Sequence, residues 1–170
     1  MTYKQRVAGL VIAVAAIGAA LGHEWPASSS PAAAPRADVG RRGLDPALQG
    51  ALRQATADAA DDGVELVVES GRRSRAYQEL LLREAIAKYG SEAEAARWVA
   101  TPDTSPHVSG DAIDIGPAEA TTWLSANGAR YGLCQIYGNE PWHYELRREA
   151  ADEGCPPMYP DPTYDPRMQQ

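Results

Sequence analysis

The sequence changes character at residue 43, and this break determines how much chain is left to form a core. An uncharged run, residues 7–22, is followed by a segment, residues 23–43, that is rich in Pro, Ala and Ser. Because this second segment has no apolar periodicity, it is typical of a flexible linker. We therefore expect one folded domain, residues 44–170, since a chain of 170 residues has room for no more.

Residues 1–22 have the pattern of an export signal. Lys4 and Arg6 form a short positive region, and small residues close the uncharged run before Gly22. The run is short for a membrane-spanning helix, which needs roughly 20 apolar residues, but an uncleaved anchor or membrane tether through residues 7–22 is the alternative. Both alternatives place the domain outside the cytoplasm, in the periplasm, in the extracellular space or at the cell wall.

The chain is acidic, with a net charge of -7. It therefore lacks the positive surface that nucleic-acid binding requires, and DNA and RNA are poor candidate partners. Apolar residues make up 44% of the chain, which is ordinary for a globular protein, and Phe is absent, so other apolar side chains must fill the core. We expect a monomer.

Two cysteines, Cys134 and Cys155, lie in the expected domain. In an exported protein an even number of cysteines favours a disulfide. Closing a loop of this size would stabilise the fold by about 3 kcal/mol in the chain-entropy model. A pair of zinc ligands is the alternative, but the spacing matches no common zinc motif.

Capping residues and apolar spacing predict a mixture of helices and short strands. Asp45 is placed to cap a first helix that starts at Pro46 and ends at Asp61-Asp62-Gly63. Further helices are expected over residues 75–88 and 91–99 and from Pro117 to Asn127. Strands are expected over residues 64–69, 112–115, 133–137 and 142–146, a loop over 101–109, and an irregular tail after Gly154. The mixture predicts an α+β fold whose strands are mostly local neighbours.

Two of the three histidines, His107 and His143, belong to the expected domain, and both stand near carboxylates. A hydrolytic zinc ion takes three protein ligands and leaves a fourth position for water. His107, Asp114 and His143 fit the ligand role. Strand alternation puts His143 on one face with Glu145, and it lets Asp114 and His143 project together if their strands pair.

A carboxylate close to the metal is needed to accept the proton of the attacking water. Glu140 precedes His143 by three residues, and Pro141 restricts the backbone between them. Glu140 is therefore the expected general base. Glu145 is the rival, but its place on the face of His143 favours a role in orienting that ligand.

These residues resemble the VanY-like zinc D-alanyl-D-alanine carboxypeptidases and their D,D-dipeptidase relatives. Residues 105–114, Ser-Pro-His-Val-Ser-Gly-Asp-Ala-Ile-Asp, match the pattern SxHxxGxAxD, and residues 140–143 match ExxH. Residues 70–74 with Gln78 resemble SGxRSxxxQ, although Arg72 stands where the family usually has an aromatic residue. The three elements occur in family order, and together they are far more specific than any one of them.

The resemblance implies a fold, a metal and an activity. The fold is a small antiparallel sheet flanked by helices, as in the hedgehog signalling domain and the D,D-peptidases. His107, Asp114 and His143 would hold Zn²⁺, and Glu140 would act as general base and pass its proton to the leaving amine. The activity would be carboxypeptidase trimming of peptidoglycan stem peptides that end in D-alanyl-D-alanine.

The resemblance also implies roles around the metal. Arg73 would stabilise the oxyanion of the tetrahedral intermediate, and Gln78 and Ser105 would hold the terminal carboxylate of the substrate. Two alternatives stay open: an L,D-carboxypeptidase or wall endopeptidase of the same fold, and a non-catalytic module that binds zinc or wall peptide. The presence of Glu140 favours an enzyme, because a structural metal site has no use for a base.

Overall fold

The computed structural model describes residues 42–169. The predicted export segment, residues 1–22, and most of the predicted linker, residues 23–43, lie outside these residues. At the centre of the described part is a four-stranded antiparallel sheet with the strand order β1-β2-β4-β3. The strands are β1 (Val67–Ser70), β2 (Ala112–Gly116), β3 (Leu133–Gln135) and β4 (His143–Leu146). The predicted α+β class with a small antiparallel sheet is confirmed.

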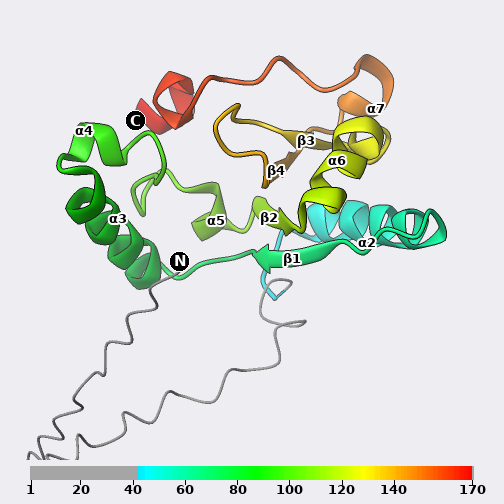
Figure 1. Ribbon diagram of the computed structural model, residues 1–170, viewed down its shortest axis with the longest axis horizontal. Helices are drawn as coiled ribbons and strands as arrows, with labels where there is room; N and C mark the ends of the chain where they lie inside the picture. The colour runs from blue at the N-terminus through cyan, green and yellow to red at the C-terminus, as the bar shows by residue number, and fades with distance from the viewer. Residues whose placement is uncertain (1–41, 170) are drawn as a thin grey trace, which may run out of the picture. The chain divides into compact units, whose positions relative to one another are not determined.

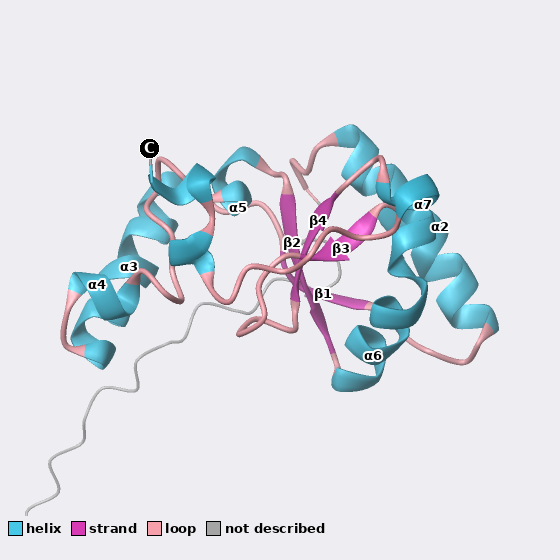
Figure 2. Ribbon diagram, turned by 90° about the horizontal axis from the view of Figure 1, so that it is seen from above, coloured by secondary structure: helices cyan, strands magenta, loops and turns pink. Residues whose placement is uncertain are grey.

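Helices lie on both sides of the sheet (Figures 1 and 2). The α-helices are α2 (Pro46–Asp61), α3 (Arg75–Tyr89), α4 (Glu92–Ala95), α5 (Pro106–Ser109), α6 (Ala118–Asn127) and α7 (Ala150–Glu153). Three 3-10 helices follow the same order of the chain: η1 (Gly128–Tyr131), η2 (Pro162–Tyr164) and η3 (Pro166–Gln169). Within residues 42–169, no helix combines the length and the apolar character that crossing a membrane requires.

One face of the sheet forms the main core with α2 and α6. Leu48 and Leu52 of α2 are buried against Ile113, Ile115 and Tyr144 of the two central strands. Burying each such side chain contributes roughly 1.5–3 kcal/mol. Because side chains alternate along a strand, the residues between these apolar positions point to the opposite face. That second face carries the polar residues of the candidate site.

The ends of the first two helices form as their capping residues predict. The carboxylate of Asp45 accepts hydrogen bonds from the backbone amides of Ala47, at 2.9 Å, and Leu48, at 3.1 Å. These bonds satisfy two of the amides that have no partner inside the helix. Gly90 ends α3 in the left-handed conformation, with φ of 86°, which a glycine adopts without steric cost.

Several predicted boundaries were wrong, and tertiary contacts explain them. The first strand begins at Val67 rather than at residue 64, because Val67 pairs with Gly116, the last residue of β2. Helix α4 stops at Ala95 instead of continuing to residue 99. The chain turns there, and Trp98 stacks on Tyr89 of α3 with 5.8 Å between ring centroids.

The expected loop over residues 101–109 contains the single-turn helix α5. Pro106 begins it and Gly110 ends it in the left-handed conformation, so one of the two prolines that indicated a loop starts a helical turn instead.

The tail after Gly154 is also more ordered than predicted. A disulfide joins Cys134 of β3 to Cys155, as expected from the sequence. Beyond it, Tyr159 donates its backbone N–H to the carbonyl of Ile136 at 2.9 Å and accepts one from Gly138 at 2.8 Å. The tail therefore packs along the outer end of the sheet, where no local apolar pattern could have indicated it.

Gly110 gives the first prediction. Its φ is 92°, and a Cβ there would lie 2.5 Å from the carbonyl oxygen of Gly43. Gly90 has a similar φ of 86° with open space around the Cβ position. We expect Gly90→Ala to lower the free energy of unfolding by roughly 1–2 kcal/mol from backbone strain alone. Gly110→Ala should cost more, about 3 kcal/mol or above, because a backbone clash is added.

Denaturant unfolding of the two variants beside the unchanged protein measures the difference. Equal losses of stability would show that the close approach of Gly110 to Gly43 has no energetic consequence.

Candidate metal and catalytic site

Three predicted ligands meet on the polar face of the sheet. Strand β2 pairs with β4 in a register that sets Asp114 opposite His143, and α5 brings His107 over the same point. All three residues are buried, with exposed fractions of 4% for His107, 8% for Asp114 and 3% for His143. Within residues 42–169 they are the one group of His, Cys, Asp and Glu side chains whose geometry suits a metal ion.

The ligand atoms form a nearly regular triangle. Nε2 of His107 lies 3.2 Å from Nδ1 of His143, and Oδ1 of Asp114 lies 3.3 Å from the first nitrogen and 3.4 Å from the second. Ligand atoms about 2.0–2.1 Å from a tetrahedral zinc ion are about 3.3–3.4 Å apart. The observed spacing therefore matches three corners of such a tetrahedron.

Hydrogen bonds at the other two ring nitrogens fix the orientation and the tautomer of each histidine. Nδ1 of His107 lies 2.9 Å from the carbonyl oxygen of Gly71, and Nε2 of His143 lies 3.2 Å from Oε1 of Glu145. Both partners are acceptors, so these nitrogens carry the protons of the neutral rings. The lone pairs of the opposite nitrogens then point into the triangle, as in metal sites whose histidines are oriented by acceptors.

The charges and lone pairs of this arrangement suit a cation. Within the described residues Oδ1 of Asp114 is buried without a hydrogen-bond partner, and it faces two nitrogen lone pairs. Burial lowers the pKa of His107, which keeps that ring neutral. Burial also lowers the pKa of His143, but its close contacts with the carboxylates of Asp114 and Glu145 outweigh burial and raise the pKa to about 9. The triangle thus accommodates either a proton on His143 or a metal ion that displaces it.

Arg73 holds the other oxygen of Asp114. Its Nη2 donates to Oδ2 of Asp114 at 2.5 Å, and its Nε donates to Oγ of Ser70 at 2.9 Å. Burial raises the pKa of Asp114, but its contacts with both histidines and with Arg73 outweigh burial and hold the pKa well below the usual range. Asp114 is therefore ionised and ready to bind a cation.

Glu140 lies beside the triangle. Its Oε2 is 3.8 Å from Nδ1 of His143, and the backbone N–H of His143 donates to the carbonyl of Glu140 at 3.1 Å. This turn aims both side chains at one small cavity of about 70 Å³. Burial raises the pKa of Glu140 to about 7, which suits a group that must gain and release a proton near neutral pH.

Two predicted substrate residues line the same cavity. Gln78 is buried, and its Nε2 donates to the carbonyl of Ala100 at 2.9 Å while its Oε1 accepts from Arg73 at 3.4 Å. Ser105 precedes α5, but its hydroxyl does not cap that helix. The Ser105 hydroxyl thus lines the cavity without capping α5, whereas much of the Gln78 amide is occupied by the protein.

Sequence reasoning placed Glu145 beside His143 but missed the residues that hold both of them from behind. Glu145 is buried and binds Arg147 and Arg167 as well as His143. Tyr137, whose ring centroid lies 5.1 Å from that of His143, donates its hydroxyl to Asp165 at 3.0 Å. Arg167 and Asp165 lie in the tail that was expected to be irregular, so no sequence pattern connected them to the site.

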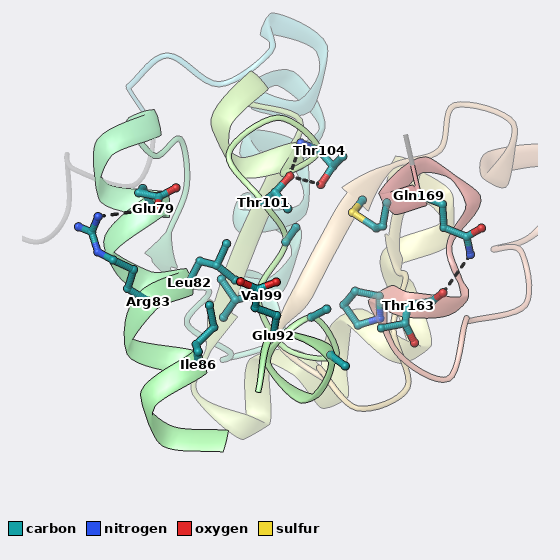
Figure 3. A pocket seen from close by; sticks show the side chains of 15 residues that line it. Glu79, Leu82, Arg83, Ile86, Glu92, Val99, Thr101, Thr104, Thr163 and Gln169 are labelled. Atoms are coloured by element: carbon teal, nitrogen blue, oxygen red, sulfur yellow. Dashed lines mark hydrogen bonds and ion pairs between the residues drawn. The ribbon is translucent and has the colours of Figure 1, made fainter. Parts of the chain in front are cut away.

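A larger cavity of about 650 Å³ lies next to the site, between α3, α4 and the two terminal 3-10 helices (Figure 3). Leu82, Ile86 and Val99 contribute apolar surface, and Glu79, Arg83 and Glu92 contribute charges. Three residues line both cavities: Val99, Ala100 and Pro162. The catalytic cavity and the larger one are therefore direct neighbours.

Comparison with known proteins agrees with this geometry. The sequence profile of the family described as VanY, D-alanyl-D-alanine carboxypeptidase, matches residues 41–148. The chain belongs to the VanY family. A D-alanyl-D-alanine carboxypeptidase of Enterococcus faecalis is 34% identical over 59% of this chain. That match covers 46% of the relative, so the chain spans about half the length of this curated relative.

Solved structures of VanY proteins share the fold. A vancomycin-resistance D,D-pentapeptidase VanY in complex with Zn(II) has a TM-score of 0.60 and 32% identity, covering 65% of this chain and 76% of its own. VanYB in complex with D-alanine-D-alanine has the same TM-score and identity, and the match covers 65% of this chain and 75% of VanYB. An L,D-carboxypeptidase, DacB of Streptococcus pneumoniae, has a TM-score of 0.54 and 26% identity over 69% and 73%. The hedgehog/D,D-peptidase-like fold expected from the sequence is confirmed.

Metal binding should stabilise the folded protein through Asp114. Adding Zn²⁺ at about 100 times its Kd should stabilise the native state by about 2.7 kcal/mol, seen as a higher thermal midpoint. Asp114→Asn should lose most of this rise, because it removes the charge from the triangle. Asp111→Asn, an exposed position three residues away, is the matched control and should keep it. A rise that survives in Asp114→Asn would contradict the ligand assignment.

Proposed function

We propose that this protein is an exported, zinc-dependent D-alanyl-D-alanine carboxypeptidase that trims peptidoglycan stem peptides. The observation that carries the proposal is the buried triangle of ligand atoms with Glu140 beside it. Family membership and the zinc-bound and dipeptide-bound VanY structures support the metal and the substrate class.

The ligands would be Nε2 of His107, Oδ1 of Asp114 and Nδ1 of His143. A zinc ion held there supplies Lewis acidity for the scissile carbonyl and lowers the pKa of water to about 7. The protein contributes a dry site and fixed ligand orientations, since Gly71 and Glu145 hold the two histidine rings. Both features strengthen electrostatic effects at the reacting carbonyl.

Glu140 would act first as the general base and then as the general acid. Its buried carboxylate accepts a proton as water oxygen bonds to the carbonyl carbon, and then delivers it to the amide nitrogen as the carbon–nitrogen bond breaks. The products are free D-alanine and a peptide shortened by one residue. A pKa of about 7 lets Glu140 both accept and give the proton.

Arg73 and Ser105 would position the substrate. Arg73 is held by Asp114 and Ser70 but lines the cavity, so its guanidinium lies beside the negative charge that develops on the carbonyl oxygen. Ser105 would donate its hydroxyl to the terminal carboxylate, and Gln78 would set the adjoining wall through its bond to Ala100. The fork of Arg73 thus has a second task, which is to orient the ligand Asp114.

The setting of the enzyme is part of the proposal. An export signal or anchor in residues 1–22, followed by a linker, would present a monomeric peptidase domain at the cell wall, where the substrate lies. The Cys134–Cys155 disulfide supports an oxidising compartment.

An L,D-carboxypeptidase is the second candidate. The similarity to DacB, at 26% identity and a TM-score of 0.54, supports it. The two activities share the metal chemistry and differ in the residue that precedes the released D-alanine. A pentapeptide ending in D-alanyl-D-alanine and a tetrapeptide ending in a single D-alanine therefore distinguish them.

Substitution of the two glutamates should separate chemistry from metal binding. Glu140→Gln keeps the shape but not the basicity, so kcat should fall about 10²–10⁴-fold while zinc stays bound. Glu145→Gln should instead weaken zinc binding, because its carboxylate fixes His143. Metal analysis and turnover of both variants test this. Undiminished turnover in Glu140→Gln would remove Glu140 from the mechanism and leave Glu145 as the rival base.

The activity itself is tested by metal content and D-alanine release from the two peptides. We expect one zinc per chain and release of one D-alanine from the pentapeptide, lost on adding a chelator and regained with zinc. Release from the tetrapeptide alone would favour the L,D-carboxypeptidase. Zinc without release from either peptide would favour a non-catalytic module, and absence of zinc would contradict the site.

A further inference from the structure

The tail of the chain contacts the back of the candidate metal site. The family match ends at residue 148, and the segment from Cys155 to Gln169, here called the C-terminal strap, follows it. Arg167 of the strap donates to Glu145 through Nη1 at 2.7 Å and through Nη2 at 3.2 Å. The second bond reaches Oε1, the same oxygen that contacts Nε2 of His143.

We propose that the C-terminal strap is a positioning element of the metal site, with Arg167 fixing Glu145 and, through it, the ligand His143. The inference rests on the proposed zinc site. It adds a dependence of that site on a segment outside the part of the chain that matches the family.

Arg167 is suited to this role by its own attachments. Asp165 holds the guanidinium through Nε at 3.0 Å and through Nη2, and it also accepts the backbone N–H of Arg167 at 2.9 Å. Arg167 therefore lies between two buried carboxylates, Asp165 and Glu145. A planar guanidinium with both edges occupied has little freedom, so it fixes the direction of the Glu145 carboxylate.

A second path leads from the strap to the same ligand. Asp165 accepts the hydroxyl hydrogen of Tyr137 at 3.0 Å, and the Tyr137 ring lies against the His143 ring, with 5.1 Å between centroids. The strap thus acts on His143 at its outer nitrogen through Glu145 and on its ring face through Tyr137. Glu145 and Tyr137 lie in the part of the chain that supplies the ligands, but Arg167 and Asp165, which hold them, lie in the strap.

The strap is itself held at several points. The disulfide joins its first residue to β3, and Asp161 accepts a bond from Arg97 at 3.0 Å. At its end, Nε2 of Gln169 donates to the carbonyl oxygen of Thr163 at 3.1 Å, closing the last turn beside the larger cavity (Figure 3). These attachments fix the strap on both sides of Arg167, and Asp165 then holds its guanidinium.

The physical consequence concerns metal affinity. Groups that orient a ligating histidine typically change metal affinity or activity by about 10–100-fold when removed. Without Arg167, Oε2 of Glu145 still accepts a hydrogen bond from Arg147 at 2.7 Å. Oε1 loses the hydrogen bond that Arg167 donates to it. The carboxylate is then free to turn, and His143 loses the fixed acceptor that aims its Nδ1 into the triangle.

The test measures zinc affinity of Arg167→Gln by competition with a chelator, together with the visible spectrum of the cobalt(II)-substituted protein. We expect the Kd for zinc to rise about 10–100-fold and the cobalt spectrum to change, because ligand geometry is altered. Arg167→Lys, which keeps the charge but not the fork, should restore affinity only in part. The thermal midpoint of the metal-free protein is recorded beside these values, so that loss of folding is separated from loss of positioning.

Two arginines nearby provide controls. Arg148 is exposed, and Arg148→Gln should leave zinc affinity and spectrum unchanged. Arg147→Gln removes a contact to Oε2 of Glu145 alone and should weaken zinc less than Arg167→Gln does. The proposal would be overturned if Arg167→Gln had the same zinc affinity and the same cobalt spectrum as the unchanged protein.

If Arg167→Gln does not fold, zinc affinity is measured in Arg167→Lys and Asp165→Asn instead. Unchanged zinc affinity in both variants would also overturn the proposal. Failure of the proposed zinc site gives a different result, since the unchanged protein would then bind no zinc at all. Failure of the proposed activity alone would leave zinc bound to the unchanged protein without release of D-alanine.

Discussion

The antiparallel pairing of β2 with β4 is the constraint on which the site depends. It sets Asp114 opposite His143 and at the same time places Ile113 and Tyr144 on the other face, in the main core. A shift of one residue in this register would turn the metal ligands into the core and the apolar residues into the cavity. The free energy of core packing therefore also fixes the geometry of the ligands.

Charge balance is the second constraint on this face of the sheet. Asp114, Glu140, Glu145 and Asp165 are all buried, and an unpaired buried carboxylate is costly. Arg73 pairs with Asp114, and Arg167 pairs with Glu145 and Asp165. Within residues 42–169 no arginine pairs with Glu140, which contacts His143 at 3.8 Å, and burial raises the pKa of Glu140 to about 7. Arginines thus balance the charges of Asp114, Glu145 and Asp165. Glu140 is left at the cavity as a proton acceptor whose pKa lies near neutral pH.

Local sequence signals predicted the elements whose causes are local. The Asp45 cap, the Gly90 stop and the apolar spacing of α2 depend on neighbours within one or two turns, and the structure has them. Strand β1 and helix α4 were predicted too long, because their ends are set by distant partners: Gly116 for β1, and the stacking of Trp98 on Tyr89 for the turn after α4. The strap was predicted as irregular, because its contacts with β3, Arg97 and Glu145 are all long-range.

The sequence by itself determined the chemistry available to this protein: two domain histidines, the carboxylates near them, and two cysteines that form the disulfide. Spacing and residue type were enough to name the three side chains that the structure brings into one triangle. Only the tertiary structure decided which atom of each side chain faces the centre, because Gly71 and Glu145 accept hydrogen bonds from the two histidines and Arg73 donates one to Asp114. It also decided the part played by Arg167, since a contact across 22 residues follows from packing and leaves no periodic signal in the sequence.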